Sequence, residues 1–292
     1  MGYDPELGWR LLPDVEKRGP FWGVDEPART NSRGWRDAEH PLAKPPGVRR
    51  IVALGDSFTF GVDADYGERY TEVLERDVER CEVVNLGVNA FGTAQELRAL
   101  EVYGLAYDPD VVVLVVFLGN DLDDIRTLRR GSWPSPYYRL EDGELELVPP
   151  VLTWDVRVRT ASYVGEYLMR ALGPELRSSI RAPEWETADT VPLFAALVAR
   201  MAAVSEQHDA RFLAVLTYNS SRAATGPTER EARARAALEQ AGVAVVDALP
   251  AFTARLEAGE ELFAGGDGHW NAAGHALVAD LIRRALAKRG WL

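Results

Sequence analysis

The stretch VALGDSFTFG, residues 52–61, runs from an apolar segment into the tripeptide Gly-Asp-Ser. An apolar run that stops at a glycine is typical of a buried strand that ends at the edge of a sheet. Ser57 then follows the carboxyl end of that strand, which makes it a candidate nucleophile. Because a free serine hydroxyl is a poor nucleophile, this interpretation requires a base, a carboxylate that orients the base, and donors for an oxyanion.

Residues 49–292 alternate short apolar runs with longer amphipathic segments. This alternation predicts one α/β domain, a three-layer α/β/α sandwich with a central parallel sheet of the flavodoxin-like type. The run 111–118 is apolar at every position, as expected for a strand that is covered on both faces. The predicted strands are 51–54, 81–86, 111–118, 212–217 and 243–246, and the predicted helices are 67–80, 93–103, 191–208, 227–241 and 271–289.

The first 48 residues lie outside this alternation and are rich in Pro, Gly, Trp and Arg. Trp9, Trp22 and Trp35 favour burial, because disordered segments contain few aromatic residues. We therefore expect residues 1–48 to form an ordered extension packed on the core.

Residues 125–188 interrupt the alternation for about 60 residues, a length typical of a functional insertion. Within this segment, 137–140 and 145–148 are predicted to form a hairpin that turns at Asp142-Gly143, and 161–172 a short helix. We interpret residues 125–188 as a cap over the substrate side of the domain.

Composition excludes several classes of protein. The formal charge of -12 disfavours nucleic acids and anionic membrane surfaces as partners, and the single cysteine, Cys81, excludes an internal disulfide. The longest apolar run has eight residues, against the ~20 that span a bilayer, and the first residues lack the pattern of a signal peptide. We expect a soluble protein, cytoplasmic or a trimmed exported form, whose oligomeric state the sequence leaves open.

His269 is the candidate base among four histidines. It lies in GGDGHWN, residues 265–271, a glycine-rich loop just ahead of the last predicted helix, where functional residues of open α/β sheets concentrate. Asp267 precedes it by two positions and can accept a hydrogen bond from its Nδ1 and stabilise the imidazolium. His275 falls within the helix with no carboxylate in the preceding six residues, so we interpret it as structural.

Asn120 is the candidate side-chain donor for the oxyanion. It follows the strand 111–118 in Gly-Asn-Asp, which places an amide at a strand's carboxyl end, although turn asparagines are equally common. The strand at 81–86 leads into GVNAFGT, residues 87–93, whose backbone can present a further N–H to the same oxygen. An acidic set follows Asn120 and is interpreted as a solvated helix start rather than a metal site: Asp121, Asp123 and Asp124.

Gly-Asp-Ser, Gly-Asn-Asp and a late Asp-x-His, in that order, resemble the SGNH (GDSL-type) hydrolase superfamily, from about Arg50 to the C-terminus. The resemblance implies that Ser57 is the nucleophile and supplies one oxyanion N–H. It also implies that Asn120 is the side-chain donor, that His269 is the base, and that Asp267 orients it.

Two features depart from the family pattern. The family's second block offers a glycine N–H five residues after an asparagine; counting from Asn85, this position is Ala90, with Gly92 as a second choice. The family's usual Asp-x-x-His is here a compressed Asp-x-His. Asp56, beside the nucleophile, is expected to be a structural hydrogen-bonding residue.

The resemblance implies a serine esterase that works through an acyl-enzyme without a cofactor or a metal. Short acyl esters of a carbohydrate or another small alcohol are the expected substrates, and a lipase-like or lysophospholipase-like activity is an alternative. The compressed Asp-x-His motif followed by Trp also resembles SGNH-like acetyltransferases, so O-acyl transfer is a second alternative activity. A third alternative is a binding module that keeps the fold without the activity.

Other chemistries fit the sequence poorly. The nucleophile elbow Gly-x-Ser-x-Gly is absent, because Phe58 and Thr59 follow the serine. Neither a Gly-x-Gly-x-x-Gly after the first strand nor a Walker loop occurs, and one cysteine with four scattered histidines disfavours zinc.

Overall fold

A parallel sheet of five strands forms the centre of the computed structural model, which describes residues 1–17, 28–126, 129–130, 133–171, 189–265 and 268–292. The strand order is β13-β12-β7-β5-β6, and every neighbouring pair is parallel. The predicted parallel sheet is therefore confirmed. The strands are β5 (Arg49–Gly55), β6 (Cys81–Asn85), β7 (Val111–Phe117), β12 (Arg211–Thr217) and β13 (Ala244–Asp247).

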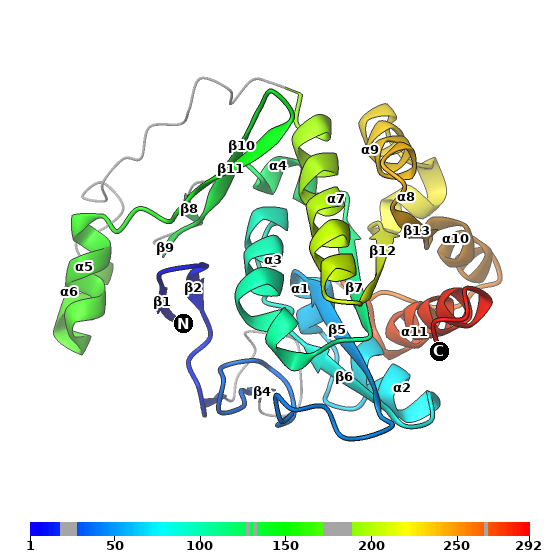
Figure 1. The fold of residues 1–292 in the computed structure, drawn as a ribbon, viewed down its shortest axis with the longest axis horizontal. Coiled ribbons are helices and arrows are strands. Elements are labelled where there is room, and N and C mark those ends of the chain that lie inside the picture. The colour runs from blue at the N-terminus through cyan, green and yellow to red at the C-terminus, as the bar shows by residue number, and fades with distance from the viewer. Residues whose placement is uncertain (18–27, 127–128, 131–132, 172–188, 266–267) are drawn as a thin grey trace.

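Strand side chains alternate between two apolar layers, one on each face of the sheet. In β5, Val52 and Leu54 pack in one layer, whereas Ile51 and Ala53 pack in the other. Both layers are covered by helices, which gives the three-layer sandwich (Figure 1). The first layer lies under α3 (Thr93–Ala99), α7 (Val191–Gln207) and α9 (Glu229–Gln240), and the second under α2 (Tyr70–Asp77), α10 (Leu249–Glu257) and α11 (Ala272–Lys288).

Several helix boundaries differ from the expectation. The helix predicted at 67–80 begins only at Tyr70, since Gly67 has a φ of 94° that no helical residue adopts. The helix predicted at 227–241 begins after Thr228, whose hydroxyl accepts a hydrogen bond from the Glu231 N–H in a capping box. Neither α10 nor the short α8 (Ser220–Thr225) was expected, whereas Asn271 caps α11 as predicted.

The N-terminal extension packs on the first apolar layer. Trp9 and Trp35 are buried, and their rings contact those of Phe91 and Tyr103 with centroids 5.0 and 5.6 Å apart. The expected burial is thus confirmed for these two tryptophans, while Trp22 lies outside the described residues. Two antiparallel strand pairs occur in the extension: β1 (Gly2–Asp4) with β2 (Gly8–Arg10), and β3 (Glu16–Lys17) with β4 (Ala28–Arg29).

The segment interpreted as a cap contains the predicted hairpin, which pairs β10 (Tyr137–Glu141) with β11 (Glu144–Val148). Asp142 and Gly143 both have positive φ, 52° and 85°, as a two-residue hairpin turn requires. In the same segment, β8 (Arg129–Arg130) pairs antiparallel with β9 (Trp133–Pro134).

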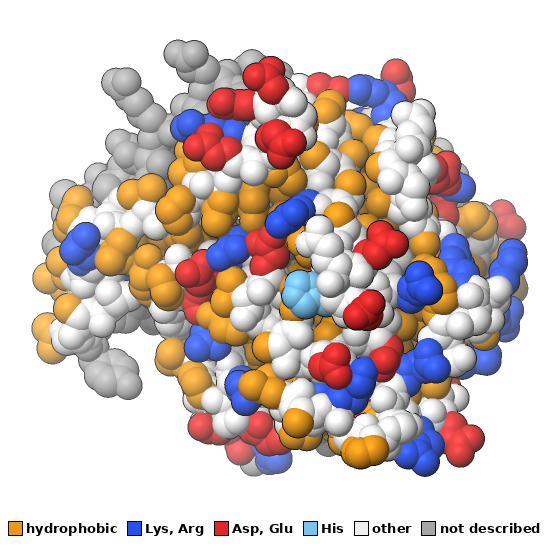
Figure 2. Space-filling model, viewed as in Figure 1, with side chains coloured by type: hydrophobic (Ala, Val, Ile, Leu, Met, Phe, Trp, Pro, Cys, Tyr) orange, Lys and Arg blue, Asp and Glu red, His pale blue; other side chains and the backbone are white. Residues whose placement is uncertain are grey.

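The helix predicted at 161–172 is confirmed as α6 (Tyr163–Ala171). A helix that was not expected, α5 (Trp154–Ala161), precedes it, and the two are separate because Ser162 between them is extended, with φ −167° and ψ 163°. These two helices stand away from the sheet (Figure 1), and apolar side chains gather at this end of the molecule (Figure 2). The exposed apolar residues of α5 and α6 are Trp154, Val164, Tyr167 and Leu168. Among the described residues, no helix combines the length and apolar character that crossing a membrane requires.

Candidate active site

Ser57 begins the four-residue helix α1 (Ser57–Phe60) directly after β5. The chain turns sharply at Gly55, whose φ is 152° and whose missing Cβ would lie 2.3 Å from Thr59 Oγ1 and 2.9 Å from the Val115 carbonyl. Only glycine fits this close approach. Asp56 caps the helix by accepting a hydrogen bond of 3.0 Å from the Phe58 N–H. The carboxyl end of β5, the neighbour of the central strand β7, therefore carries the serine in a fixed turn.

Two buried arginines support the other end of this turn. Arg36, from the extension, donates to the carbonyls of Phe60 at 3.0 Å and Gly61 at 2.5 Å, and Arg69 donates to the Phe60 carbonyl at 3.4 Å. Burial and the neighbouring Arg69 charge lower the pKa of Arg36 to about 9. The extension thus contributes directly to the turn that carries Ser57.

His269 meets Ser57 from the opposite end of the sequence. Its Nε2 lies 2.8 Å from Ser57 Oγ, across a separation of 212 positions. The neighbouring Trp270 is fully buried and packs against Phe58, with ring centroids 4.7 Å apart. The His269 carbonyl accepts a hydrogen bond of 2.8 Å from the Ala264 N–H, so the backbone that carries the imidazole is held on its C-terminal side. The contact between Nε2 and Oγ is the one that a serine needs for activation by a base.

The predicted orienting acid, Asp267, lies outside the described residues, so its role stays a prediction. His275, the rejected base, is fully buried in α11, where its Nδ1 accepts a hydrogen bond of 3.3 Å from the Tyr70 N–H. Burial, with the charges of Arg69 and Arg36, lowers the pKa of His275 to about 3. A ring with such surroundings serves packing between α11 and α2.

Asn120 lies at the start of α4 (Asp121–Asp124), beyond the carboxyl end of β7. Its Nδ2 donates a hydrogen bond of 3.2 Å to Asp56 Oδ2. This bond places the amide next to the residue that precedes Ser57, and it leaves the second Nδ2 hydrogen for another acceptor. Asp56 accepts from Asn120 and from the Phe58 N–H, which agrees with the structural role expected for it.

Ala90 adopts a φ of 74°, in the left-handed region where a methyl side chain is strained. Within the described part of the chain, the N–H groups of Ala90 and Ser57 have no intramolecular acceptor. The Gly92 N–H, by contrast, donates at 3.4 Å to Gln95 Oε1. Ala90 is therefore a better candidate for the oxyanion donor than Gly92.

Sequence reasoning was wrong about Asp121, which is fully buried rather than solvated and accepts a hydrogen bond of 2.8 Å from the Phe117 N–H. It missed Glu96, which is buried on α3. Burial, with the neighbouring acidic groups of Asp56 and Asp124, raises the pKa of both carboxyls well above the usual range. Asp123 is exposed, as expected, and pairs with Arg230 at 2.8 Å. No cluster suited to a metal ion occurs among the described residues.

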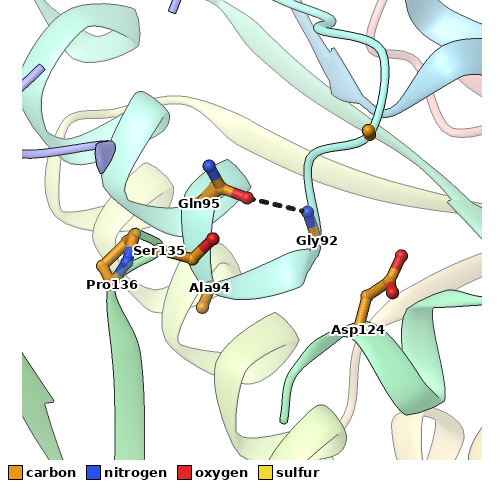
Figure 3. A pocket seen from close by; sticks show the side chains of 7 residues that line it. Gly92, Ala94, Gln95, Asp124, Ser135 and Pro136 are labelled. Carbon is orange, nitrogen blue, oxygen red and sulfur yellow. Dashed lines mark hydrogen bonds between the residues drawn. The ribbon is translucent and has the colours of Figure 1, made fainter. Parts of the chain in front are cut away.

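A small pocket lies beside Ala90, at the start of α3 (Figure 3). Asp124 faces the loop that carries Gly92 from one side, and Ser135 with Pro136 closes the other side. The pocket encloses about 10 Å³, enough for about one water molecule. Its lining is Ala90, Gly92, Ala94, Gln95, Asp124, Ser135 and Pro136.

Comparison with solved structures finds similar folds at low sequence identity. A lipase/acylhydrolase from Enterococcus faecalis is 17% identical, with a TM-score of 0.49, over 83% of this chain and 97% of that one. TesA is 16% identical, with a TM-score of 0.48, over 84% and 100%. An acetyl xylan esterase, AlAXEase, is 14% identical, with a TM-score of 0.48, over 81% and 99%. No curated protein matches the chain.

The sequence pattern of the GDSL-like lipase/acylhydrolase family matches residues 53–277. The matched region covers most of the chain and contains Ser57, Asn120 and His269. The protein is therefore a member of the GDSL-like lipase/acylhydrolase family, a family of ester hydrolases.

Proposed function

We propose that the protein hydrolyses short acyl esters of a carbohydrate or another small alcohol through an acyl-enzyme on Ser57. The observation that carries this proposal is the 2.8 Å contact between Ser57 Oγ and His269 Nε2 at the carboxyl end of β5. A serine hydroxyl in that contact can pass its proton to the imidazole as the oxygen attacks a carbonyl carbon.

The remaining groups then have defined roles. Asp267 orients His269 and stabilises the imidazolium, and the N–H groups of Ser57 and Ala90 with the Asn120 amide bind the oxyanion. The imidazolium next protonates the leaving alcohol. In the second half-reaction, His269 takes a proton from water as the water oxygen attacks the acyl carbon. The bond between that carbon and Ser57 Oγ then breaks, the imidazolium returns the proton to Oγ, and the acid leaves.

The pocket beside Ala90 supports a small and polar substrate. It holds about one water molecule, too little space for a long hydrocarbon chain, and its lining includes the polar side chains of Asp124 and Ser135, which suit hydroxyls.

The test is hydrolysis of 4-nitrophenyl acetate, butyrate and octanoate, and of an acetylated monosaccharide, by the native protein, Ser57→Ala and His269→Ala. Both variants are expected to lose ~10⁴ or more in kcat while remaining folded. Ser205→Ala is the matched control, because it removes a buried hydroxyl of α7 that donates at 2.8 Å to the Met201 carbonyl. Ester hydrolysis by Ser57→Ala at the native rate would refute the proposed mechanism.

Two further results separate the alternatives. Acyl transfer to a sugar that exceeds hydrolysis would identify an acyltransferase, and a preference for octanoate would identify a lipase-like enzyme. A degenerate binding module would leave Ser57 unlabelled by a fluorophosphonate, whereas an esterase incorporates the label at that serine.

A further inference from the structure

Three buried carboxyl groups from three elements converge behind the turn that carries Ser57. Asp56 is 0% exposed, Glu96 on α3 is 1% exposed and Asp121 on α4 is 0% exposed. Each of them interacts electrostatically with another member of the set or with the nearby Asp124. Three negative charges in one buried region would repel one another strongly, so the set must contain protons at neutral pH.

The hydrogen bonds show that Asp56 is the carboxyl group whose ionised form is stabilised. Asp56 accepts hydrogen bonds from the Phe58 N–H at 3.0 Å and from Asn120 Nδ2 at 3.2 Å. A carboxylate accepts on both oxygens, and hydrogen bonds to a charged acceptor are the stronger ones. One ionised carboxylate at Asp56 thus holds the first turn of α1 and the orientation of the Asn120 amide together.

Glu96 is the member with the opposite surroundings. Neither of its carboxyl oxygens accepts a hydrogen bond among the described residues, and the charged groups that interact with it are Asp56 and Asp124, both acidic. Nothing in these contacts stabilises a charge on Glu96, so the neutral acid is favoured. Asp121 is intermediate, because one of its oxygens accepts from the Phe117 N–H while the other has no donor in the described part of the chain.

We infer that Glu96 is a positioning residue that carries a proton at neutral pH, which keeps Asp56 ionised and the Asn120 amide turned toward the oxyanion. This inference rests on the proposed esterase mechanism. If the proton lay on Asp56 instead, Asp56 could donate to Asn120 Oδ1, which has no donor among the described residues, so the amide could flip and turn Nδ2 away. When Glu96 loses its proton to solvent at alkaline pH, it adds a second buried negative charge beside that of Asp56, and this charge opposes the oxyanion.

The groups around Asp56, Glu96 and Asp121 determine whether oxyanion binding strengthens or weakens as the pH rises. Asp56 faces Asn120, His269 and Asp124, and Asp121 faces Glu96, Asp56 and Asp124. Burial raises the pKa of Asp56, whereas its two hydrogen bonds and the imidazole of His269 favour the ionised form. Deprotonation of Glu96 adds one more opposing charge, so oxyanion binding weakens as the pH rises.

The test compares pH profiles of kcat for the native protein, Glu96→Gln and Glu101→Gln. A glutamine side chain is neutral at every pH, so Glu96→Gln is expected to stay within threefold of native at pH 7 and to lack the alkaline fall of the native profile. Glu101→Gln is the control at the C-terminal end of the same helical segment, where Glu101 pairs at 2.6 Å with Arg98, and it should retain the native profile. An unchanged alkaline limb in Glu96→Gln, or a fall of more than tenfold at pH 7 in the folded variant, would overturn the inference.

A second measurement does not depend on the variant or on activity. Infrared difference spectra of the native protein should show a carboxylic-acid C=O band at pH 7 that titrates away at alkaline pH, since solvated carboxyls are already ionised at neutrality. The absence of that band at pH 7 would also refute the inference. Because this readout needs no substrate, it stands even if Ser57→Ala shows that the proposed function is wrong.

Discussion

Replacing Asn120 by alanine tests the oxyanion site most directly. We propose three donors there: the backbone N–H groups of Ser57 and Ala90, and the Nδ2 hydrogen that Asn120 does not give to Asp56. Loss of one of three such donors typically lowers kcat by ~10² to 10³, or about 2.7–4 kcal/mol of transition-state stabilisation. The same change leaves Asp56 Oδ2 without its donor, and a buried acceptor left unpaired costs about 1–3 kcal/mol of folding stability.

The assay must therefore separate catalysis from stability. Initial rates with 4-nitrophenyl acetate give kcat and KM, and urea unfolding gives the free energy of unfolding. Thr228→Ala is the matched control, because it removes the N-cap of α9 at a cost of about 0.5–2 kcal/mol without touching the site. A fall in kcat with a nearly constant KM in Asn120→Ala, and native kcat in Thr228→Ala, is expected. A kcat for Asn120→Ala within threefold of native would exclude the amide from the oxyanion site.

Three further predictions concern other residues. Asp267→Asn should lower kcat by ~10⁴ through loss of the productive imidazole tautomer; a fall of less than tenfold in the same ester assay would assign the acid elsewhere. The pKa of His275 is about 3 in the folded protein and 6.5 ordinarily, so between pH 3 and pH 6.5 the unfolded chain binds one more proton than the folded protein. Stability is then complete above about pH 6.5 and declines toward pH 3, and urea midpoints at pH 7 and 4.5 should differ less in His275→Gln than in the native protein. Burial raises the pKa of Cys81 to about 12, so iodoacetamide at pH 8 should label it only after unfolding in urea; rapid labelling of the native protein would contradict this.

The sequence predicted the parts of the fold that follow from local pattern. An apolar run such as 111–118 identifies a buried strand wherever it lies, and Gly-Asp-Ser or Gly-Asn-Asp after such a strand places a side chain at the sheet's carboxyl edge. The contact between Ser57 and His269 could be predicted because both residues belong to motifs of one family.

The buried charges could not be predicted in this way. Glu96 lies one position before Leu97 on α3, and both side chains are buried in a helix against which β5, α7 and β10 pack. Arg36 and Arg69 likewise look like surface residues in the sequence, and their burial depends on carbonyls supplied by a turn 24 or more residues away from Arg36. Such burial depends on tertiary contacts, and the spacing of apolar residues along the sequence does not predict it.

The proposed nucleophile, Ser57, and the proposed base, His269, are 212 positions apart, so they are synthesised at different times. At synthesis rates of 5–20 residues per second, roughly 10 to 40 s pass on the ribosome between the addition of Ser57 and that of His269. All five strands of the sheet precede His269, so the emerging chain can assemble its central layer while the serine has no base. A chain interrupted before His269 would therefore display the serine on its sheet but remain unable to cleave an ester, and activity begins only when the segment ahead of α11 arrives.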